Sequence, residues 1–200
     1  ICTNRGLSPD AVQCLLRACL TKYDFQLTVS FSVESLIDRS RSIVATQFLD
    51  SDNDVLLFID DDILYNPEDI SLLIADCIEK NSIVAGPYCL KKPGNVLAIK
   101  PLDMEQSFHV GSSGGLQEVK YMSTGFMAIP RAVLAAVSSA MQRANLGREM
   151  EMYPIFQPVV HAGDYLSEDW AFCQRAANLG FAIWMDSRIR LGHIGPHVFV

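Results

Sequence analysis

The sequence predicts one α/β domain whose central sheet is mostly parallel, flanked by helices, and joined to a small antiparallel part. Two observations lead to this prediction. Short apolar runs alternate with segments of helical length over the first 86 residues, which is typical of parallel strands joined by crossover helices. The chain has 200 residues, of which 50% are hydrophobic and 20% charged, and this suits one domain with a substantial core. We therefore expect residues 1–200 to fold as a single domain.

The first part of the chain is expected to follow the order βαβαβαβ. A strand at the N-terminus leads to a helix over residues 8–22, because Ser8 is a suitable N-cap and Pro9 suits the first helical position. A third helix is expected to open at Asn66 and Pro67. This third helix is expected over residues 67–80, and the second over residues 38–49. The strands between the helices are expected over residues 26–32, 54–59 and 82–86.

The second part of the chain is less regular. From residue 87 to residue 120 it is rich in Gly, Pro and Ser and has short alternating segments, which predict loops and antiparallel strands. A helix follows over residues 130–144, and another over residues 167–180 is expected to be capped by Ser167 and to end at Gly180. The last strand is expected over residues 181–186, before a tail too rich in glycine for a helix.

Composition excludes several classes of protein. The net charge of −7 argues against a nucleic-acid-binding surface, which needs clustered Lys and Arg. No apolar run approaches the roughly 20 residues that cross a bilayer, so we expect no membrane span. The six cysteines form no C-x-x-C pair, and we expect reduced, mostly buried thiols and a cytoplasmic location.

Three consecutive acids, Asp60, Asp61 and Asp62, follow the apolar strand expected at residues 54–59. In an open α/β sheet, ligands bind beyond the carboxyl ends of the strands, and such acids lie at one of these ends. Side chains alternate along an extended segment, so Asp60 and Asp62 share a side. Their oxygens suit Mg²⁺ or Mn²⁺ with positions left for a diphosphate. An exposed acidic turn is the alternative, and the apolar flanks of the acids argue against it.

Positive partners for a phosphate are expected among three arginines. Arg5 follows the first strand, and Arg39 and Arg41 open the helix after the second. Each alone is also typical of a solvated surface arginine. Their common position after successive strands favours a place at the same edge of the sheet.

Two acids and a histidine near the C-terminus complete the candidates. Glu168 and Asp169 lie in the first turn of a helix, where the dipole keeps a carboxylate ionised, as a general base requires. They can equally serve only to stabilise the helix. His193 is a candidate metal ligand or an ordinary loop histidine. Its spacing to His197 does not indicate zinc, because Pro196 breaks any helix between them.

One interpretation of the acids is a phosphohydrolase that resembles the haloacid dehalogenase type, with Asp60 as the nucleophile and Asp62 as the acid. That family needs a cation, usually a lysine, late in the chain, and no lysine follows Lys120. Leu64 also stands where Thr or Val is usual. The other residue types that this interpretation uses are present at Thr124, Asp164 and Asp169.

The ordered motifs as a set instead resemble the nucleotide-sugar-dependent glycosyltransferases of the Rossmann-like GT-A fold. They are similar to family 2-like bacterial and phage enzymes and to the capsid-glycan transferases of large algal viruses. A phosphatase has no need of the paired arginines before the acids or of the Gly-His near the C-terminus. The motifs lie at residues 38–70, 83–92, 121–134, 166–186 and 190–195 and span most of the chain.

The resemblance implies a transfer from a nucleoside diphosphate sugar, most simply a UDP-sugar, to a hydroxyl of a glycan or glycoprotein, with Mn²⁺ or Mg²⁺ as cofactor. The donor nucleotide would bind the half of about residues 1–90, and the acceptor that of about residues 91–200. A viral protein of this kind would act in the host cytoplasm. An inactive nucleotide-sugar-binding module is a further alternative.

The resemblance also assigns roles to individual residues. Asp60, Asp62 and His193 would hold the metal. Asp169, with Glu168 beside it, would deprotonate the acceptor in an inverting reaction. An Asp169 that points away from the acceptor would instead fit a retaining one. The implied donor-binding residues are Thr3, Arg5, Arg39, Arg41, Asp60, Asp61 and Gly125.

Overall fold

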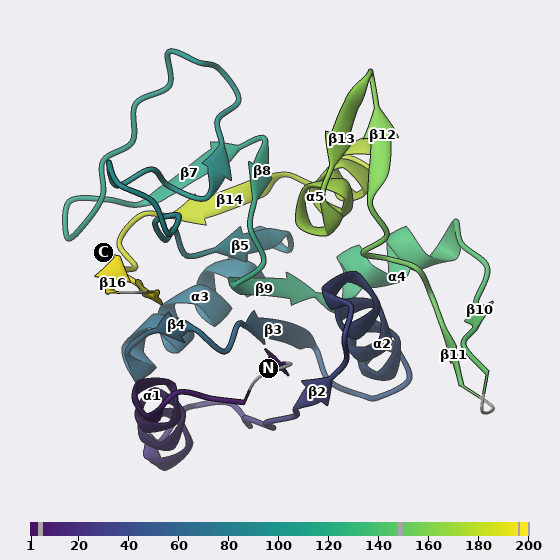
Figure 1. Cartoon of the computed structure of the whole chain (residues 1–200), viewed down its shortest axis with the longest axis horizontal. Coiled ribbons are helices and arrows are strands. Elements are labelled where there is room, and N and C mark those ends of the chain that lie inside the picture. Colours follow the sequence, from purple (N-terminus) through teal and green to yellow (C-terminus); the bar gives the residue numbers. More distant parts are fainter. Residues whose placement is uncertain (4–5, 148–149, 196, 200) are drawn as a thin grey trace.

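The computed structural model describes residues 1–3, 6–147, 150–195 and 197–199, and these ranges contain five helices and sixteen strands. The helices are packed around a central sheet (Figure 1). The helix starts predicted at Ser8 and Asn66 are confirmed, because Ser8 accepts a hydrogen bond from the N–H of Ala11 and Asn66 forms a capping box with Asp69. The helices are α1 (Pro9–Leu20), α2 (Ile37–Leu49), α3 (Pro67–Lys80), α4 (Arg131–Ser139) and α5 (Glu168–Asn178).

The central sheet is mixed, so the expectation of a mostly parallel sheet is wrong. Its spatial order is β3 (Val55–Ile59), β9 (Phe126–Pro130), β5 (Ile83–Ala85), β14 (Ile183–Asp186) and β7 (Leu116–Val119). β3, β5 and β14 run in one direction, whereas β9 and β7 run in the other. The cause is β9, a fully buried strand that lies between β3 and β5 and that the sequence patterns did not reveal.

The N-terminal strand lies beside the first of the three acids. β1 (Cys2–Thr3) pairs in parallel with β2 (Ser32–Val33), and Cys2 forms a parallel bridge with Asp60. The strand expected over residues 26–32 is therefore wrong except at its last residue. Most of residues 26–31 are exposed, so their alternating pattern does not reflect one face turned to a core.

A small antiparallel sheet joins the C-terminus to the segment after the acids. β4 (Ile63–Leu64) pairs with β15 (Gly192–Ile194), which pairs with β16 (Val198–Phe199). The register places His193 opposite Ile63, next to Asp62 in the sequence. This pairing brings together residues that are far apart along the chain.

Antiparallel pairs make up the rest of the strands. β6 (Ile99–Lys100) with β8 (Tyr121–Met122) agrees with the antiparallel strands predicted after residue 87. β10 (Ala144–Asn145) pairs with β11 (Glu151–Met152), and the helix predicted to residue 144 ends already at Ser139. β12 (Val159–His161) and β13 (Asp164–Leu166) form a hairpin beside α5 (Figure 1).

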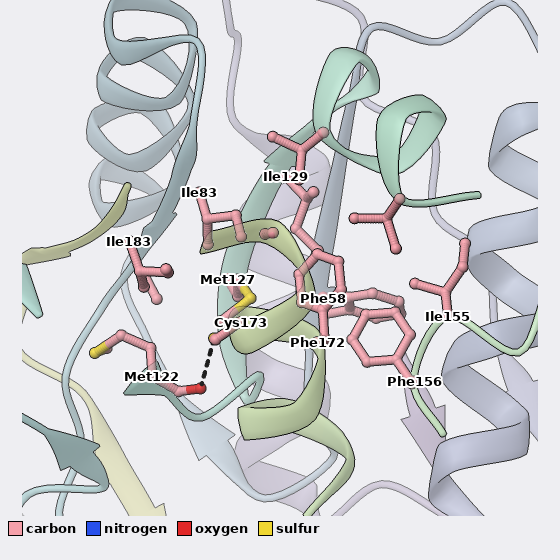
Figure 2. Close-up of a cluster of buried hydrophobic side chains, with 14 of the residues drawn as sticks. Phe58, Ile83, Met122, Met127, Ile129, Ile155, Phe156, Phe172, Cys173 and Ile183 are labelled. Atoms are coloured by element: carbon pink, nitrogen blue, oxygen red, sulfur yellow. Dashed lines mark hydrogen bonds between the residues drawn. The ribbon is translucent and has the colours of Figure 1, made fainter. Parts of the chain in front are cut away.

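Both faces of the sheet are buried. Residues of α2, α4 and α5 pack on one face and residues of α1 and α3 on the other. On the first face the ring of Phe58 meets Phe156 edge to face at 5.4 Å between centroids, and Phe172 packs beside them (Figure 2). The thiol of Cys173 donates to the carbonyl of Met122 at 3.6 Å (Figure 2).

The cysteines are free thiols, as predicted, at positions 2, 14, 19, 77, 89 and 173. Burial raises the pKa of the Cys77 and Cys173 thiols to about 12, so both stay protonated. Within the described ranges, none of the helices has the length and apolar character to span a membrane.

Candidate active site

A cleft of about 540 Å³ lies at the carboxyl end of β3, where the sequence predicted a ligand site. The three acids form part of its wall, with Thr3 of β1 and Glu168 of α5. These five residues come from three separate segments of the chain. β1, the acids and the start of α5 therefore meet at this cleft.

Arg41 is a buried cation between two of these acids. Its Nη2 atom lies 2.9 Å from both carboxylate oxygens of Asp60, and its Nη1 atom lies 2.7 Å from Oε1 of Glu168. The Arg41 side chain is only 4% exposed. Burial lowers the pKa of Arg41, but the charges of Asp60 and Glu168 outweigh it and the net shift is upward, so the guanidinium stays charged. Arg41 thus explains part of how adjacent acids are tolerated. Its predicted contact with a donor stays a prediction.

Asp61 is paired with the N-terminal strand. The hydroxyl of Thr3 donates to Oδ2 of Asp61 at 2.5 Å and accepts from the N–H of Gly6 at 3.0 Å. Thr3 and Asp61 therefore present polar groups together in the cleft, and their donor-binding role stays a prediction. The predicted donor contact Arg5 lies outside the described residues.

Asp62 meets two positive or potentially positive groups. Nζ of Lys91 lies 2.5 Å from its Oδ2 atom, and Nε2 of His193 lies 3.5 Å from its Oδ1 atom. Partial burial raises the pKa of Asp62, but hydrogen bonds and charge from His193 and Lys91 outweigh this and hold the pKa below its usual value. The backbone fixes the pair as well, because the carbonyl of Asp62 accepts from the N–H of Ile194 at 2.8 Å.

The ring of His193 has a fixed orientation. Its Nδ1 atom lies 2.8 Å from the carbonyl oxygen of Cys89, and a carbonyl only accepts, so Nδ1 carries the proton. Nε2 is then the atom turned to Asp62. Metal-binding histidines are oriented in this way, with the second ring nitrogen donating to a carbonyl. The ring of Tyr88 packs edge to face on His193 at 5.0 Å.

Asp62 offers a carboxylate oxygen and His193 an imidazole nitrogen, and a Mn²⁺ or Mg²⁺ ion held by these two groups would take its other ligands from phosphate oxygens and water. Asp60, the third predicted ligand, is not brought to this point, because both of its oxygens face Arg41. Within the described part of the chain no group of three His, Cys, Asp or Glu side chains is arranged to hold a metal ion. Asp62 and His193 are therefore the two predicted ligands that lie close enough together to hold one ion.

Gly125 contacts the backbone of the first acid. Its carbonyl accepts from the N–H of Asp60 at 2.9 Å, and its own N–H donates to the hydroxyl of Tyr88 at 3.3 Å. A Cβ at this position would lie 2.6 Å from the Tyr88 oxygen, so only glycine fits. Gly125 is buried and is not among the described residues that line the cleft. Gly125 therefore supports the backbone of Asp60, and its predicted contact with the donor stays a prediction.

The acids at the start of α5 face different surroundings. Asp169 accepts hydrogen bonds from the Ser167 hydroxyl and, at 2.8 Å, from the N–H of Trp170. Ser167 occupies the N-cap position, but its side chain serves Asp169 and does not cap the helix as predicted. Of the two acids, only Glu168 is among the described residues that line the cleft. Burial and the neighbouring Asp169 raise the pKa of Glu168, against the opposing effect of Arg41.

The remaining predicted residues are Arg39, Thr124 and Asp164. Arg39 forms an ion pair with Glu34, a residue at the cleft wall. Thr124 is fully buried, and its hydroxyl has no hydrogen-bond partner among the described residues. Asp164 is exposed on β13. Neither Thr124 nor Asp164 is among the described residues that line the cleft, so the haloacid dehalogenase-type interpretation gains no support from them.

Lys91 is the site residue that sequence reasoning missed. It lies in the loop after β5, the strand that ends at the same edge of the sheet as β3. The signal was available, because the arginines were identified by their position after successive strands. The same rule extended to β5 points to Lys91.

No protein-family model matches the chain, and no curated protein matches it. Among solved structures, the chain is similar to the crystal structure of A197 from STIV, with a TM-score of 0.61 and 19% sequence identity. The match covers 97% of this chain and 83% of A197. At this identity the likeness shows a shared fold over almost the whole chain.

Proposed function

We propose that the chain is a glycosyltransferase that moves a sugar from a nucleoside diphosphate sugar, most simply a UDP-sugar, to a hydroxyl of a glycan or glycoprotein. The observation that carries the proposal is the convergence of Asp62 and His193 beside a polar cleft that also contains Asp61 and Glu168. The likeness to A197 shows the fold alone, so the chemistry of the proposal rests on these residues.

The cleft has the size and chemistry for a nucleotide sugar. Its volume of about 540 Å³ lies within the usual range for sites of small ligands. Thr3 and Asp61 offer hydrogen-bonding groups to the hydroxyls of a ribose or sugar. Binding of the nucleotide beside β1 agrees with the expectation that about residues 1–90 form the donor half.

Asp62 and His193 are the residues that would hold Mn²⁺ or Mg²⁺ in this proposal. Such a cation offsets the charge that develops on the leaving diphosphate. The chain itself contributes the orientation of both ligands, through the carbonyl of Cys89 and the backbone bond between Asp62 and Ile194. Asp60 contributes indirectly, because it fixes Arg41 between the donor side of the cleft and α5.

Glu168 is the acid that we place at the acceptor. Arg41 contacts its Oε1 atom, so Oε2 is the oxygen that can accept a proton from an acceptor hydroxyl. The resemblance gave this role to Asp169. We transfer it to Glu168 because Glu168 lines the cleft, whereas Asp169 accepts hydrogen bonds from Ser167 and Trp170.

A thermal-shift panel tests the proposal. A ligand that binds only the folded state raises the melting temperature according to its affinity. UDP-, GDP-, dTDP- and CDP-sugars are each added with and without Mn²⁺. We expect the UDP-sugars to raise the melting temperature, more so with Mn²⁺, and we expect Asp62→Ala to remove the Mn²⁺-dependent part. A panel in which no nucleotide sugar stabilises the protein would contradict the proposal.

A further inference from the structure

Lys91 places a second cation on the carboxylate that the proposed function assigns to the metal. Its ammonium lies 2.5 Å from Oδ2 of Asp62, while His193 lies 3.5 Å from Oδ1. An ammonium and a divalent cation on one carboxylate repel each other. We propose that Lys91 competes with the divalent cation for Asp62, and that the diphosphate of a donor relieves the competition by binding the ammonium. This inference rests on the proposed function of the cleft.

The loop that carries Lys91 allows its side chain to serve two partners. The base of the loop is fixed, because the N–H of Leu90 donates to the carbonyl of Val96 at 2.8 Å and the N–H of Ala98 donates to that of Tyr88 at 2.9 Å. Between these bonds residues 91–96 are exposed. The Lys91 side chain is 36% exposed, and its flexible four-carbon stem can carry the ammonium over a distance of a few ångströms.

The aliphatic stem of Lys91 lies next to the segment that carries His193. A Cβ at Gly195 would lie 3.4 Å from Cδ of Lys91, so the stem passes over the backbone just after His193. Lys91 and His193 therefore approach Asp62 from adjacent segments. A diphosphate that completes the coordination of a cation on Asp62 and His193 would come within reach of the same ammonium.

The competition has a thermodynamic consequence. Without a diphosphate, a divalent cation that binds Asp62 either displaces the ammonium or shares the carboxylate with it, and in both cases two like charges lie close together. With a diphosphate, the ammonium has a new anionic partner, and the cation and nucleotide favour each other's binding. Such coupling is reciprocal and typically changes affinities by about 5- to 150-fold. Because of Lys91, the cation would bind tightly only when the donor is also bound.

The plain alternative is a surface ion pair without influence on ligands. Exposed pairs of this kind contribute little to stability, so their removal has little effect. Lys92 offers a matched control, since it is the adjacent, exposed lysine and its replacement changes the net charge of the protein equally.

The test is a titration of the full chain with Mn²⁺ alone, followed by the electron paramagnetic resonance signal of free Mn²⁺. The variants are Lys91→Met, Lys92→Met and Asp62→Asn, each checked for an unchanged circular dichroism spectrum. We expect Lys91→Met to bind Mn²⁺ at least about fivefold more tightly than the wild type, Lys92→Met to match the wild type, and Asp62→Asn to bind least. Addition of UDP should increase Mn²⁺ affinity strongly in the wild type and less in Lys91→Met.

Two outcomes overturn the inference. One is Mn²⁺ binding by Lys91→Met that is equal to or weaker than that of the wild type. The other is the absence of Mn²⁺ binding in the wild type and in every variant, which would remove the competition without excluding a transfer that needs no metal. Failure of the proposed function would appear separately, as absence of cleavage of any nucleotide sugar.

Discussion

Nη2 of Arg41 lies 2.9 Å from both carboxylate oxygens of Asp60, and the arginine side chain is almost completely buried. Arg41 is also bound to Glu168, so one cation connects the end of β3 with the start of α5. The two sides of the cleft are thereby held at a fixed separation.

Replacement of Arg41 by Met should destabilise the protein strongly. Removal of one partner from a buried ion pair leaves an uncompensated charge and costs roughly 3–5 kcal/mol, and we expect the lower end because Asp60 and Glu168 are partly exposed. Urea denaturation of Arg41→Met and Arg41→Lys measures the effect, and the lysine variant should lose less. A free energy of unfolding that is unchanged in Arg41→Met would show that the contacts are not made in solution.

Gly125→Ala should also destabilise the protein, because the added Cβ would lie 2.6 Å from the hydroxyl oxygen of Tyr88. Overpacking of a close-packed interior costs about 1–3 kcal/mol. Gly115→Ala is the control, since a Cβ there meets no atom within 4 Å. The thermal unfolding midpoint should fall for Gly125→Ala and stay near that of the wild type for Gly115→Ala. Equal midpoints for the two variants would rule out the close contact.

The two acids of α5 should differ in their effect on transfer. Loss of a general base typically lowers the rate by about 10²- to 10⁴-fold. We expect this loss for Glu168→Gln, with donor affinity retained, and a smaller loss for Asp169→Asn. Turnover of the best UDP-sugar and its affinity are measured for both variants. A larger loss in Asp169→Asn would return the base to the residue that the resemblance favoured.

The rate should depend on pH through Glu168. Burial and Asp169 raise the pKa of this carboxyl above its ordinary value of 4.5, and a base has to be ionised to act. The rate should therefore fall, as the pH is lowered, at a higher pH than an ordinary glutamate would give.

The stability of the protein should also depend on pH through Glu168. The folded state favours the protonated form, so the contribution of Glu168 to stability is fully present below pH 4.5 and is lost as the pH rises through the raised pKa. We expect neither the transfer rate nor the free energy of unfolding of Glu168→Gln to show this dependence when both are measured against pH.

Local signals in the sequence predicted the helices well but not the direction of the strands. Ser8 and Asn66 cap their helices through groups within three residues, and such contacts can be read from a short stretch. β9 was missed because a fully buried apolar strand has no alternation and directly precedes the helical segment at Arg131. Without β9 the sheet was expected to be mostly parallel.

The candidate site was predicted in its composition but not in its pairings. The position of the acids after a strand pointed to the cleft, and the family resemblance pointed to His193. The partners of Arg41 and the contact of Lys91 with Asp62 depend on how distant segments pack, and no local pattern contains that information. These pairings shift the proposed base to Glu168 and leave Asp62 and His193 as the proposed metal ligands.

Phosphorus NMR of the reaction products tests the central claim most directly. The wild type is incubated with a UDP-sugar, Mn²⁺ and a glycan mixture, and in parallel with simple phosphate esters. The account predicts release of UDP from the donor, a strong reduction of this release in Asp62→Ala, and no hydrolysis of the esters. Inorganic phosphate from the esters, abolished by Asp60→Asn, or undiminished release of UDP by Asp62→Ala would contradict it.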